Sequence, residues 1–219
     1  MSVEKKPGRL KAEIKKAIEN NYIANSAEAD YQINLYGKYD YMESAYFYSQ
    51  DVEAAGLEIH PSCKEMLDAY ITPIMLEKAR TGGIPIPAYF ISNGYFEPPV
   101  IIDPINPFMI KSRTVLRSNN TDKIARSMTR NYTYAICCQE LPAEAKVKKF
   151  RMILGWSTAK AYRELAMMVW DTFKLPLATI RVIVLKTGMI LISDISHLPY
   201  DDLNDKEMAY LAGKIRWEK

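Results

Sequence analysis

Two apolar segments joined by a short turn constrain the fold of this chain more than any other feature of its sequence. Residues 180–185 and 189–195 are rich in Ile, Val and Leu, and the Lys-Thr-Gly turn between them ends at Gly188. Apolar, β-branched segments separated by a glycine-containing turn are typical of a β-hairpin. The sequence therefore predicts a hairpin over residues 180–195.

Helical periodicity appears in several other places. Apolar residues at intervals of three and four predict an amphipathic helix over residues 158–173. Ser62 followed by Glu65 has the spacing of a capping box, which predicts that a helix begins at Cys63. Proline after Thr72 ends this helix and starts the next, because proline is favoured at the first helical position. That helix stops at the glycine pair 82–83, and others are expected over 5–20, 42–55, 122–130 and 206–217.

Strand-like segments alternate with these helices. Strands or extended segments are expected over residues 57–60, 84–92, 100–102, 108–116, 132–140 and 147–154. The mixture predicts an α/β protein of the α+β kind, with mixed or antiparallel sheets flanked by helices. A length of 219 residues allows one sizeable core or two small lobes.

Composition excludes several classes of protein. A net charge of +3 without a basic, aromatic stripe argues against a nucleic-acid binder. No apolar stretch approaches the roughly 20 residues of a membrane span. The charged N-terminal residues do not resemble a signal peptide. Three cysteines, two of them adjacent, are typical of reduced thiols, so a cytoplasmic protein is expected.

A tyrosine-rich segment lies between Tyr31 and Tyr48 and contains six tyrosines. Tyrosine buries its ring while its hydroxyl stays in contact with water, and it is enriched at protein interfaces. The segment is interpreted either as packing at the rim of a core or as a surface for self-association or for a protein partner.

Four segments, taken together, resemble the ATP-grasp superfamily and its RimK-like carboxylate–amine ligases. They are residues 62–90, which include a Gly-Ile-Pro-Ile-Pro sequence, residues 107–111, residues 135–141 and the hairpin with its Leu-Pro ending, residues 181–199. The resemblance implies an ATP-grasp-like domain over 57–200, preceded by a helical, tyrosine-rich segment over 1–56 and followed by a C-terminal helix over 201–219. It also implies ATP as a ligand, with Mg²⁺ less well supported.

The phosphate loop departs from the family pattern. By resemblance, Lys111 is the lysine that reaches the ATP phosphates, and a glycine-rich flap should follow it. Here residues 112–116 are Ser, Arg, Thr, Val and Leu, and the next glycine is Gly155. A loop without glycine cannot bring its backbone close to a phosphate as readily. The flap is interpreted as deleted, with Arg113 as a candidate phosphate contact.

The metal site departs from the family pattern as well. The resemblance implies that Arg181 stands where the first acidic ligand is expected, and that Asp194 and Ser196 occupy the closing Glu and Asn positions. One carboxylate with a serine is a poor Mg²⁺ site. Arg181 also lies in an apolar strand, so we expect it to pair with Asp194 across the hairpin in a buried ion pair.

The remaining candidates for a nucleotide site are Gln139 and Glu140, which the resemblance puts beside the adenine, and Arg151 on the following strand. Each also fits a plain structural role: a strand terminus for Glu140, and a solvent-facing side chain for Arg151. The catalytic residues stay unassigned.

Three functions are consistent with these residues. The first is a degenerate ATP-grasp protein, a pseudoenzyme that acts as a binding module or partner subunit. The second is an active ATP-dependent ligase that activates a carboxylate as an acyl phosphate for attack by an amine. The third is an unrelated α/β protein-interaction module.

Overall fold

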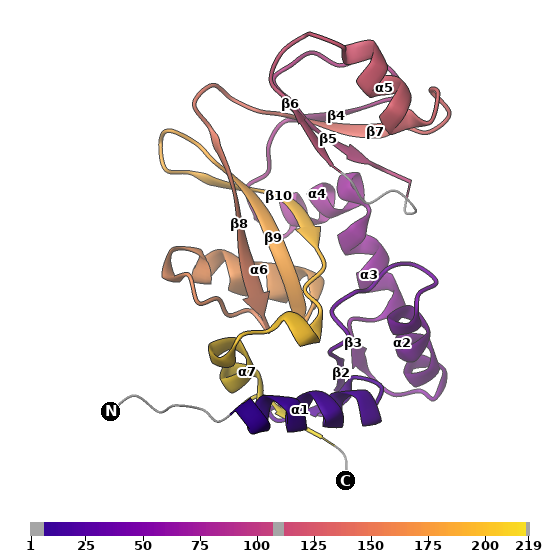
Figure 1. The fold of residues 1–219 in the computed structure, drawn as a ribbon, viewed down its shortest axis with the longest axis vertical. Coiled ribbons are helices and arrows are strands. Elements are labelled where there is room, and N and C mark those ends of the chain that lie inside the picture. The colour runs from indigo at the N-terminus through magenta and orange to yellow at the C-terminus, as the bar shows by residue number, and fades with distance from the viewer. Residues whose placement is uncertain (1–6, 107–111, 218–219) are drawn as a thin grey trace. The chain divides into compact units, whose positions relative to one another are not determined.

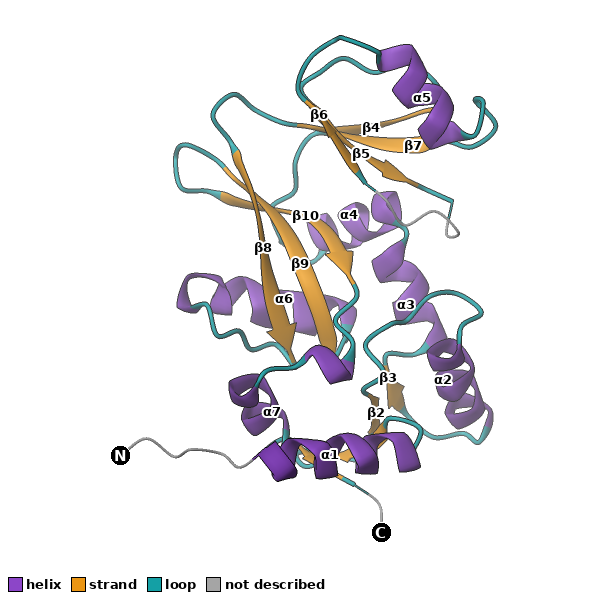
Figure 2. Ribbon diagram, viewed as in Figure 1, coloured by secondary structure: helices purple, strands orange, loops and turns teal. Residues whose placement is uncertain are grey.

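The computed structural model describes residues 7–106 and 112–217, with the side chains of residues 7–10 excepted, and shows helices combined with short sheets (Figures 1 and 2). The sheets are β11-β1-β2-β3, β10-β9-β8 and β4-β7-β5-β6. Antiparallel and parallel pairs both occur, since β2 pairs antiparallel with β1 and parallel with β3. The predicted α+β class, with mixed and antiparallel sheets flanked by helices, is confirmed.

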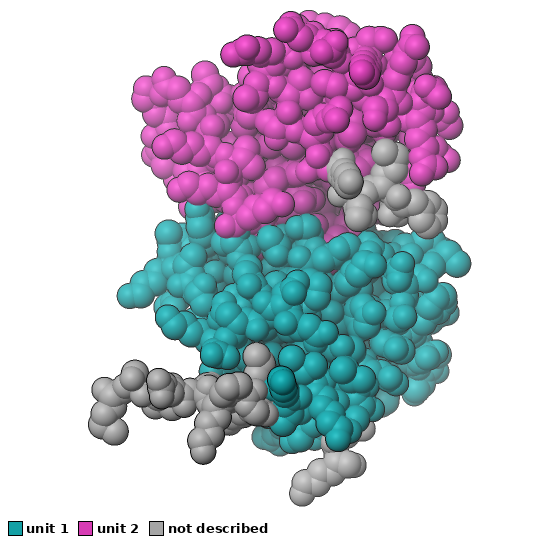
Figure 3. All heavy atoms as spheres, in the orientation of Figure 1, with its two compact units in different colours: residues 1–67, 150–179, 196–219 teal, residues 68–149, 180–195 magenta. Residues whose placement is uncertain are grey.

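The chain divides into two compact units, each of which is discontinuous in sequence (Figure 3). Unit 1 comprises residues 1–67, 150–179 and 196–219, and unit 2 comprises residues 68–149 and 180–195. Strands β8 (Lys146–Ile153), β9 (Leu177–Val184) and β10 (Ile190–Ser196) each contribute residues to both units. The predicted hairpin is present as β9 and β10.

Unit 1 contains the two ends of the described chain. Its sheet is formed by β1 (Ile23–Ser26), β2 (Gln32–Asn34), β3 (Ile59–His60) and β11 (Ile215–Arg216). Its helices are α1 (Pro7–Glu19), α2 (Ser44–Ala54), the start of α3 (Cys63–Tyr70), α6 (Arg163–Phe173) and α7 (Asp205–Leu211).

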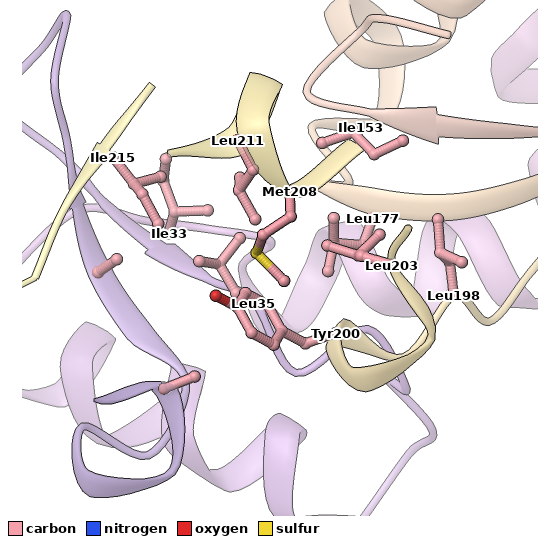
Figure 4. Packing of buried hydrophobic residues seen from close by; sticks show 12 residues of the cluster. Ile33, Leu35, Ile153, Leu177, Leu198, Tyr200, Leu203, Met208, Leu211 and Ile215 are labelled. Carbon is pink, nitrogen blue, oxygen red and sulfur yellow. The ribbon is translucent and has the colours of Figure 1, made fainter. Parts of the chain in front are cut away.

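The core of unit 1 gathers apolar side chains from segments far apart in the sequence (Figure 4). Ile33 and Leu35 meet Leu177 from β9 and Leu211 from α7, and all four are buried. Gly37 allows a close approach beside this core. It has φ +78°, and a Cβ there would lie 2.0 Å from the carbonyl oxygen of Leu198. A side chain at residue 37 would therefore disrupt the packing.

The helix starts follow the predicted signals. The backbone N–H of Glu65 donates to Ser62 Oγ at 3.2 Å, and the Ser62 N–H donates to Glu65 Oε2 at 2.7 Å. This reciprocal capping box confirms the predicted start of α3 at Cys63. Helix α4 (Thr72–Thr81) also begins and ends where expected, with proline in its first turn.

The six tyrosines of the tyrosine-rich segment pack largely against aromatic neighbours within unit 1. Tyr39 is buried and donates its hydroxyl to the carbonyl oxygen of Asn34 at 2.7 Å. The ring of Tyr36 lies 5.1 Å from that of Tyr22 and 6.2 Å from that of Tyr48. Tyr41 is 41% exposed. Packing at a core rim accounts for most of these rings, and the partner surface stays a prediction.

Unit 2 is built on the four-stranded sheet of β4 (Tyr89–Ser92), β5 (Val100–Pro104), β6 (Arg113–Val115) and β7 (Ile136–Glu140), with α4, the end of α3 and α5 (Thr121–Thr129). Side chains on a strand alternate between its faces. On one face Val100, Ile102 and Cys138 pack against Ala125 and Met128 of α5.

The other face of this sheet meets the hairpin. Ile101 packs with Leu141, with Ile183 of β9 and with Leu191 of β10. This face also carries polar residues, which form the candidate site described below.

Two expectations about the elements are wrong. A helix was expected over 206–217, but α7 ends at Leu211, and Ile215 and Arg216 pair with Ser26 and Asn25 of β1. Local periodicity carries no information about such a distant partner. The strand expected over 132–140 begins only at Ile136, because residues 130–132 have positive φ angles and turn the chain. Strands β1 and β2 were not anticipated.

Within 7–106 and 112–217, no helix is long and apolar enough to cross a membrane.

Candidate functional site

A buried polar cluster lies between the four-stranded sheet and the hairpin within unit 2. It consists of Asp103 on β5, Gln139 on β7, Arg181 on β9 and Ser193 on β10, with Asp194 at its edge. The first four are at most 3% exposed. The register explains how the sheet residues converge. Ile101 is opposite Gln139, so these two residues share a face, and Asp103, two positions along β5, shares that face too.

Arg181 is the centre of the cluster. Its Nη1 donates to Asp103 Oδ1 at 3.0 Å and its Nη2 donates to Asp103 Oδ2 at 2.7 Å. Its Nε donates to Ser193 Oγ at 2.9 Å, and Nη2 also donates to the Ser193 carbonyl oxygen at 3.1 Å. A guanidinium has five N–H donors, so these four bonds use all but one of them. The bidentate pair with Asp103 is the strongest arrangement available to an arginine and a carboxylate.

Asp194 is a secondary partner. Its Oδ2 lies 3.9 Å from Arg181 Nη1, and its side chain is 24% exposed. The sequence predicted a buried ion pair between these two residues. Arg181 is buried as expected, but its direct hydrogen-bonded partner is Asp103. The side chain of Arg181 extends from β9 to Asp103 on β5. The Arg181–Asp103 ion pair therefore links the hairpin to the four-stranded sheet.

Gln139 completes the cluster. Its Nε2 donates to Asp103 Oδ2 at 2.7 Å and to the Ser193 carbonyl oxygen at 2.8 Å. Its Oε1 is buried and accepts no hydrogen bond among the described residues. The resemblance put Gln139 beside an adenine. In the structure its amide nitrogen donates both of its hydrogen bonds to Asp103 and Ser193.

Electrostatics favour the charged form of the arginine. Burial opposes the charge of Arg181, but the carboxylates of Asp194 and Asp103 outweigh it and raise its pKa above the ordinary value. Burial raises the pKa of Asp194 to about 7, and Asp103 adds to the rise while Arg181 opposes it. Two carboxylates therefore compete for one guanidinium, and Asp103 has the better geometry.

The other predicted site residues do not join the cluster. Arg151 belongs to unit 1, where it pairs with Glu207 Oε2 at 3.0 Å and donates to the carbonyl oxygen of Asp202. Ser196, also in unit 1, donates its hydroxyl to the Thr179 carbonyl oxygen at 3.1 Å. Arg113 is exposed on β6. Lys111, with the rest of residues 107–111, lies outside the described residues.

Glu140 is exposed at the end of β7 and points to the opposite face from Gln139. Asp103 and Ser193 were missed. The signal for Asp103 was an acid next to three consecutive apolar residues of a strand, Val100–Ile102. A carboxylate so close to a core needs a cationic partner, and that requirement would have pointed to Arg181.

Comparison with known proteins gives matches in structure only. No family model matches the sequence, and no curated protein matches it. A RimK domain ATP-grasp protein from Sphaerobacter thermophilus DSM 20745 matches with a TM-score of 0.56 at 12% identity, over 77% of this chain and 73% of that chain. The D-alanine–D-alanine ligase of Helicobacter pylori matches with a TM-score of 0.56 at 12% identity, over 76% of this chain and 67% of that chain.

The fold is that of the ATP-grasp ligases. At 12% identity these matches show the fold alone, because one fold can host many different activities. The ATP-grasp ligase PsnB, solved with a phosphomimetic variant of its minimal precursor, Mg and ADP, matches at a TM-score of 0.49 and 12% identity. That match covers 78% of this chain and 62% of the PsnB chain, so the present chain spans less than two thirds of that ligase.

The cluster does not have the donor set of a magnesium site. Mg²⁺ requires near-octahedral oxygen ligands, mostly carboxylates, phosphates and water. Here the oxygens of Asp103 are held by Arg181 and Gln139, and a guanidinium lies between the two carboxylates. In the described part of the chain, no group of three or more His, Cys, Asp or Glu residues is arranged to hold a metal ion. The residues present in this ATP-grasp fold therefore fit an ion pair better than a metal ion.

Proposed function

We propose that this chain is a binding module with an ATP-grasp fold, and that it forms no acyl phosphate by itself. The observation that carries the proposal is the bidentate pair of Arg181 with Asp103, at 3.0 and 2.7 Å, buried between the sheet and the hairpin. A permanent guanidinium repels a divalent cation and neutralises the carboxylate that would bind one.

Opening this cluster for a ligand would be costly. Breaking a buried ion pair by removing one partner costs roughly 3–5 kcal/mol, because the other charge is left without compensation. A nucleotide that needed Asp103 or Gln139 would have to displace bonds that are already formed. The closed cluster therefore favours a structural role, in which it fixes the hairpin to the sheet.

The phosphate side of the fold supports the same proposal. Phosphoryl transfer depends on positive charge and backbone N–H groups arranged around the transferred group. Residues 112–131 contain no glycine, which removes the usual means of bringing a backbone against a phosphate. Arg113 stays a candidate phosphate contact, and a partner protein could supply a missing loop.

A thermal-shift measurement tests this proposal. The protein is heated with and without ATP and Mg²⁺, and the H. pylori D-alanine–D-alanine ligase serves as the positive control. A ligand at 100 times its dissociation constant adds about 2.7 kcal/mol of stability. We expect no shift for this chain and a clear shift for the control. A magnesium-dependent rise in the melting temperature of this chain would show that Mg²⁺ and nucleotide bind. That result would contradict the closed ion-pair cluster and favour the second candidate, an active ATP-dependent carboxylate–amine ligase.

A further inference from the structure

Unit 2 also contains a pocket whose lining includes none of the residues of the buried cluster. It is a pocket of about 660 Å³, which is within the range of ligand sites in proteins. Rings and prolines make up most of its lining, namely Phe90, Tyr95, Pro98, Pro99 and Pro142. The ring-bearing residues are accessible, since Phe90 is 37% exposed and Tyr95 is 70% exposed.

Strand alternation separates this pocket from the ion-pair cluster. Phe90 lies opposite Cys138, which faces α5, and Glu140 is two residues further along the same strand. Phe90 and Glu140 are therefore on the α5 face, whereas Gln139 faces the hairpin. The side chains of Phe90 and Glu140 thus face away from the ion-pair cluster, although Leu141, which also lines the pocket, packs with Ile101 on the hairpin face. None of the lining residues belongs to the ion-pair cluster, so this inference does not depend on the proposed function.

The side chains that line the pocket offer hydrogen-bond acceptors and negative charge. Two carboxylates, Glu97 and Glu140, belong to its lining, and among the described lining residues there is no lysine or arginine. The hydroxyl of Tyr95 is already committed, because it donates to Glu97 Oε1. Prolines have no backbone N–H to offer. A ligand that binds here must bring its own donors and positive charge.

A guanidinium meets all of these requirements. It is planar and stacks on aromatic rings, it has five donors arranged to meet carboxylates, and it keeps its charge at any ordinary pH. A lysine ammonium supplies charge but not the flat stacking surface. The pair of acids beside two exposed rings thus favours arginine over lysine.

The pocket is larger than one guanidinium, and its remaining surface is apolar. Rings and prolines are the surfaces on which proline-rich, extended segments dock, because both partners are already rigid and lose little conformational freedom. We propose that this pocket binds an extended peptide segment of a partner protein that carries an arginine next to proline. The guanidinium contacts Glu97 and Glu140, and the prolines pack on Phe90 and Tyr95.

The test measures fluorescence polarisation of a labelled peptide with the sequence Ala-Pro-Pro-Arg-Pro-Ala, titrated with the full chain. Matched peptides replace the arginine by lysine or by neutral citrulline. We expect binding that weakens a few-fold with lysine and about tenfold with citrulline, since charged hydrogen bonds are roughly twice as strong as neutral ones. Affinity should also fall as salt is raised.

Variants of the protein test the pocket itself. Glu97→Gln combined with Glu140→Gln should weaken binding of the arginine peptide about tenfold while leaving the citrulline peptide unchanged. Tyr95→Ala should weaken binding of both peptides. The matched controls are Glu144→Gln and Tyr134→Ala, which change exposed residues outside the lining of the pocket. Each control should bind the arginine peptide as the unmodified chain does.

Three results would overturn the proposal. One is the absence of binding by the arginine peptide, and another is equal affinity for the arginine and citrulline peptides. The third is binding that survives the Glu97 and Glu140 changes. If N-acetylargininamide binds as tightly as the peptide, the pocket recognises a small guanidinium compound, and the peptide part of the proposal is wrong. Melting curves for every variant separate lost binding from lost folding.

Discussion

The two faces of the four-stranded sheet in unit 2 differ in whether their carboxylates are buried and paired or accessible. On the hairpin face, Asp103 is buried and its two oxygens accept three hydrogen bonds from Arg181 and Gln139. On the α5 face, Glu140 lies at an accessible pocket with Glu97, and no cation lines that pocket among the described residues. The polar groups on the hairpin face are hydrogen-bonded to one another, whereas the carboxylates on the α5 face are accessible to a ligand.

The difference is clearest at two consecutive residues. Gln139 is fully buried and donates two hydrogen bonds, whereas Glu140 is exposed at the end of the same strand. Alternation along β7 separates their environments although they are neighbours in sequence. A polar pair at the end of a strand can therefore serve stability with one residue and binding with the next.

The largest effect is expected from breaking the hairpin-face pair. Arg181→Met leaves Asp103 buried without a counter-charge, so the free energy of unfolding should fall by roughly 3–5 kcal/mol. Adding Asp103→Leu should restore part of that loss, because no charge is then stranded. Urea unfolding of the two single variants and the double variant measures this coupling. A loss below about 1 kcal/mol for Arg181→Met would mean that the buried pair contributes no more to stability than an exposed ion pair does. The proposed difference between the two faces would then be wrong.

A smaller effect is expected from the two neighbours on β7. Gln139→Leu removes two buried hydrogen bonds and should cost roughly 1–3 kcal/mol. Glu140→Gln changes an exposed group and should stay within about 0.5 kcal/mol. Chemical denaturation of both variants makes the comparison directly. Equal losses at the two positions would show that Glu140 also has a structural role.

A third effect is a pH dependence at the edge of the cluster. The pKa of Asp194 is raised to about 7 by burial, so the folded state holds this proton to higher pH than the unfolded state does. Its contribution to stability is therefore full below about pH 4, the ordinary range for aspartate, and is lost as pH rises through about 7.

Asp194→Asn should remove this dependence, so the variant should gain stability relative to the unmodified chain as pH rises from about 4 to about 8. The measurement is urea unfolding of both proteins at several pH values in this range. A difference that stays constant with pH, or that falls, would mean that Asp194 is ionised throughout and belongs with Asp103 as a second counter-charge.

Much of the fold followed from local signals. The hairpin, the helices that begin at Cys63 and Thr72, and the fold class all rest on periodicity and caps that neighbouring residues determine. The strand at Ile215–Arg216 did not follow, because its partner β1 lies almost 200 residues away.

The site was predictable in part. The burial of Arg181 followed from its apolar strand, but its partner did not. Asp194 is near in sequence and is the partner that the hairpin pattern predicts. Asp103 is 78 residues away and reaches Arg181 only because the sheet packs against the hairpin. The α5-face pocket left no pattern in the sequence, because its acids and prolines come from separate segments.

The most direct test of the central claim is an assay of ATP turnover with the isolated chain. The chain is incubated with ATP, Mg²⁺ and a panel of carboxylates and amines, release of ADP is followed, and any acyl phosphate is trapped with hydroxylamine. If the Arg181–Asp103 pair occupies the place of the metal and nucleotide machinery, neither product should exceed the protein-free background. Steady magnesium-dependent turnover that disappears in both Lys111→Ala and Asp194→Ala would contradict the account and identify an active ligase.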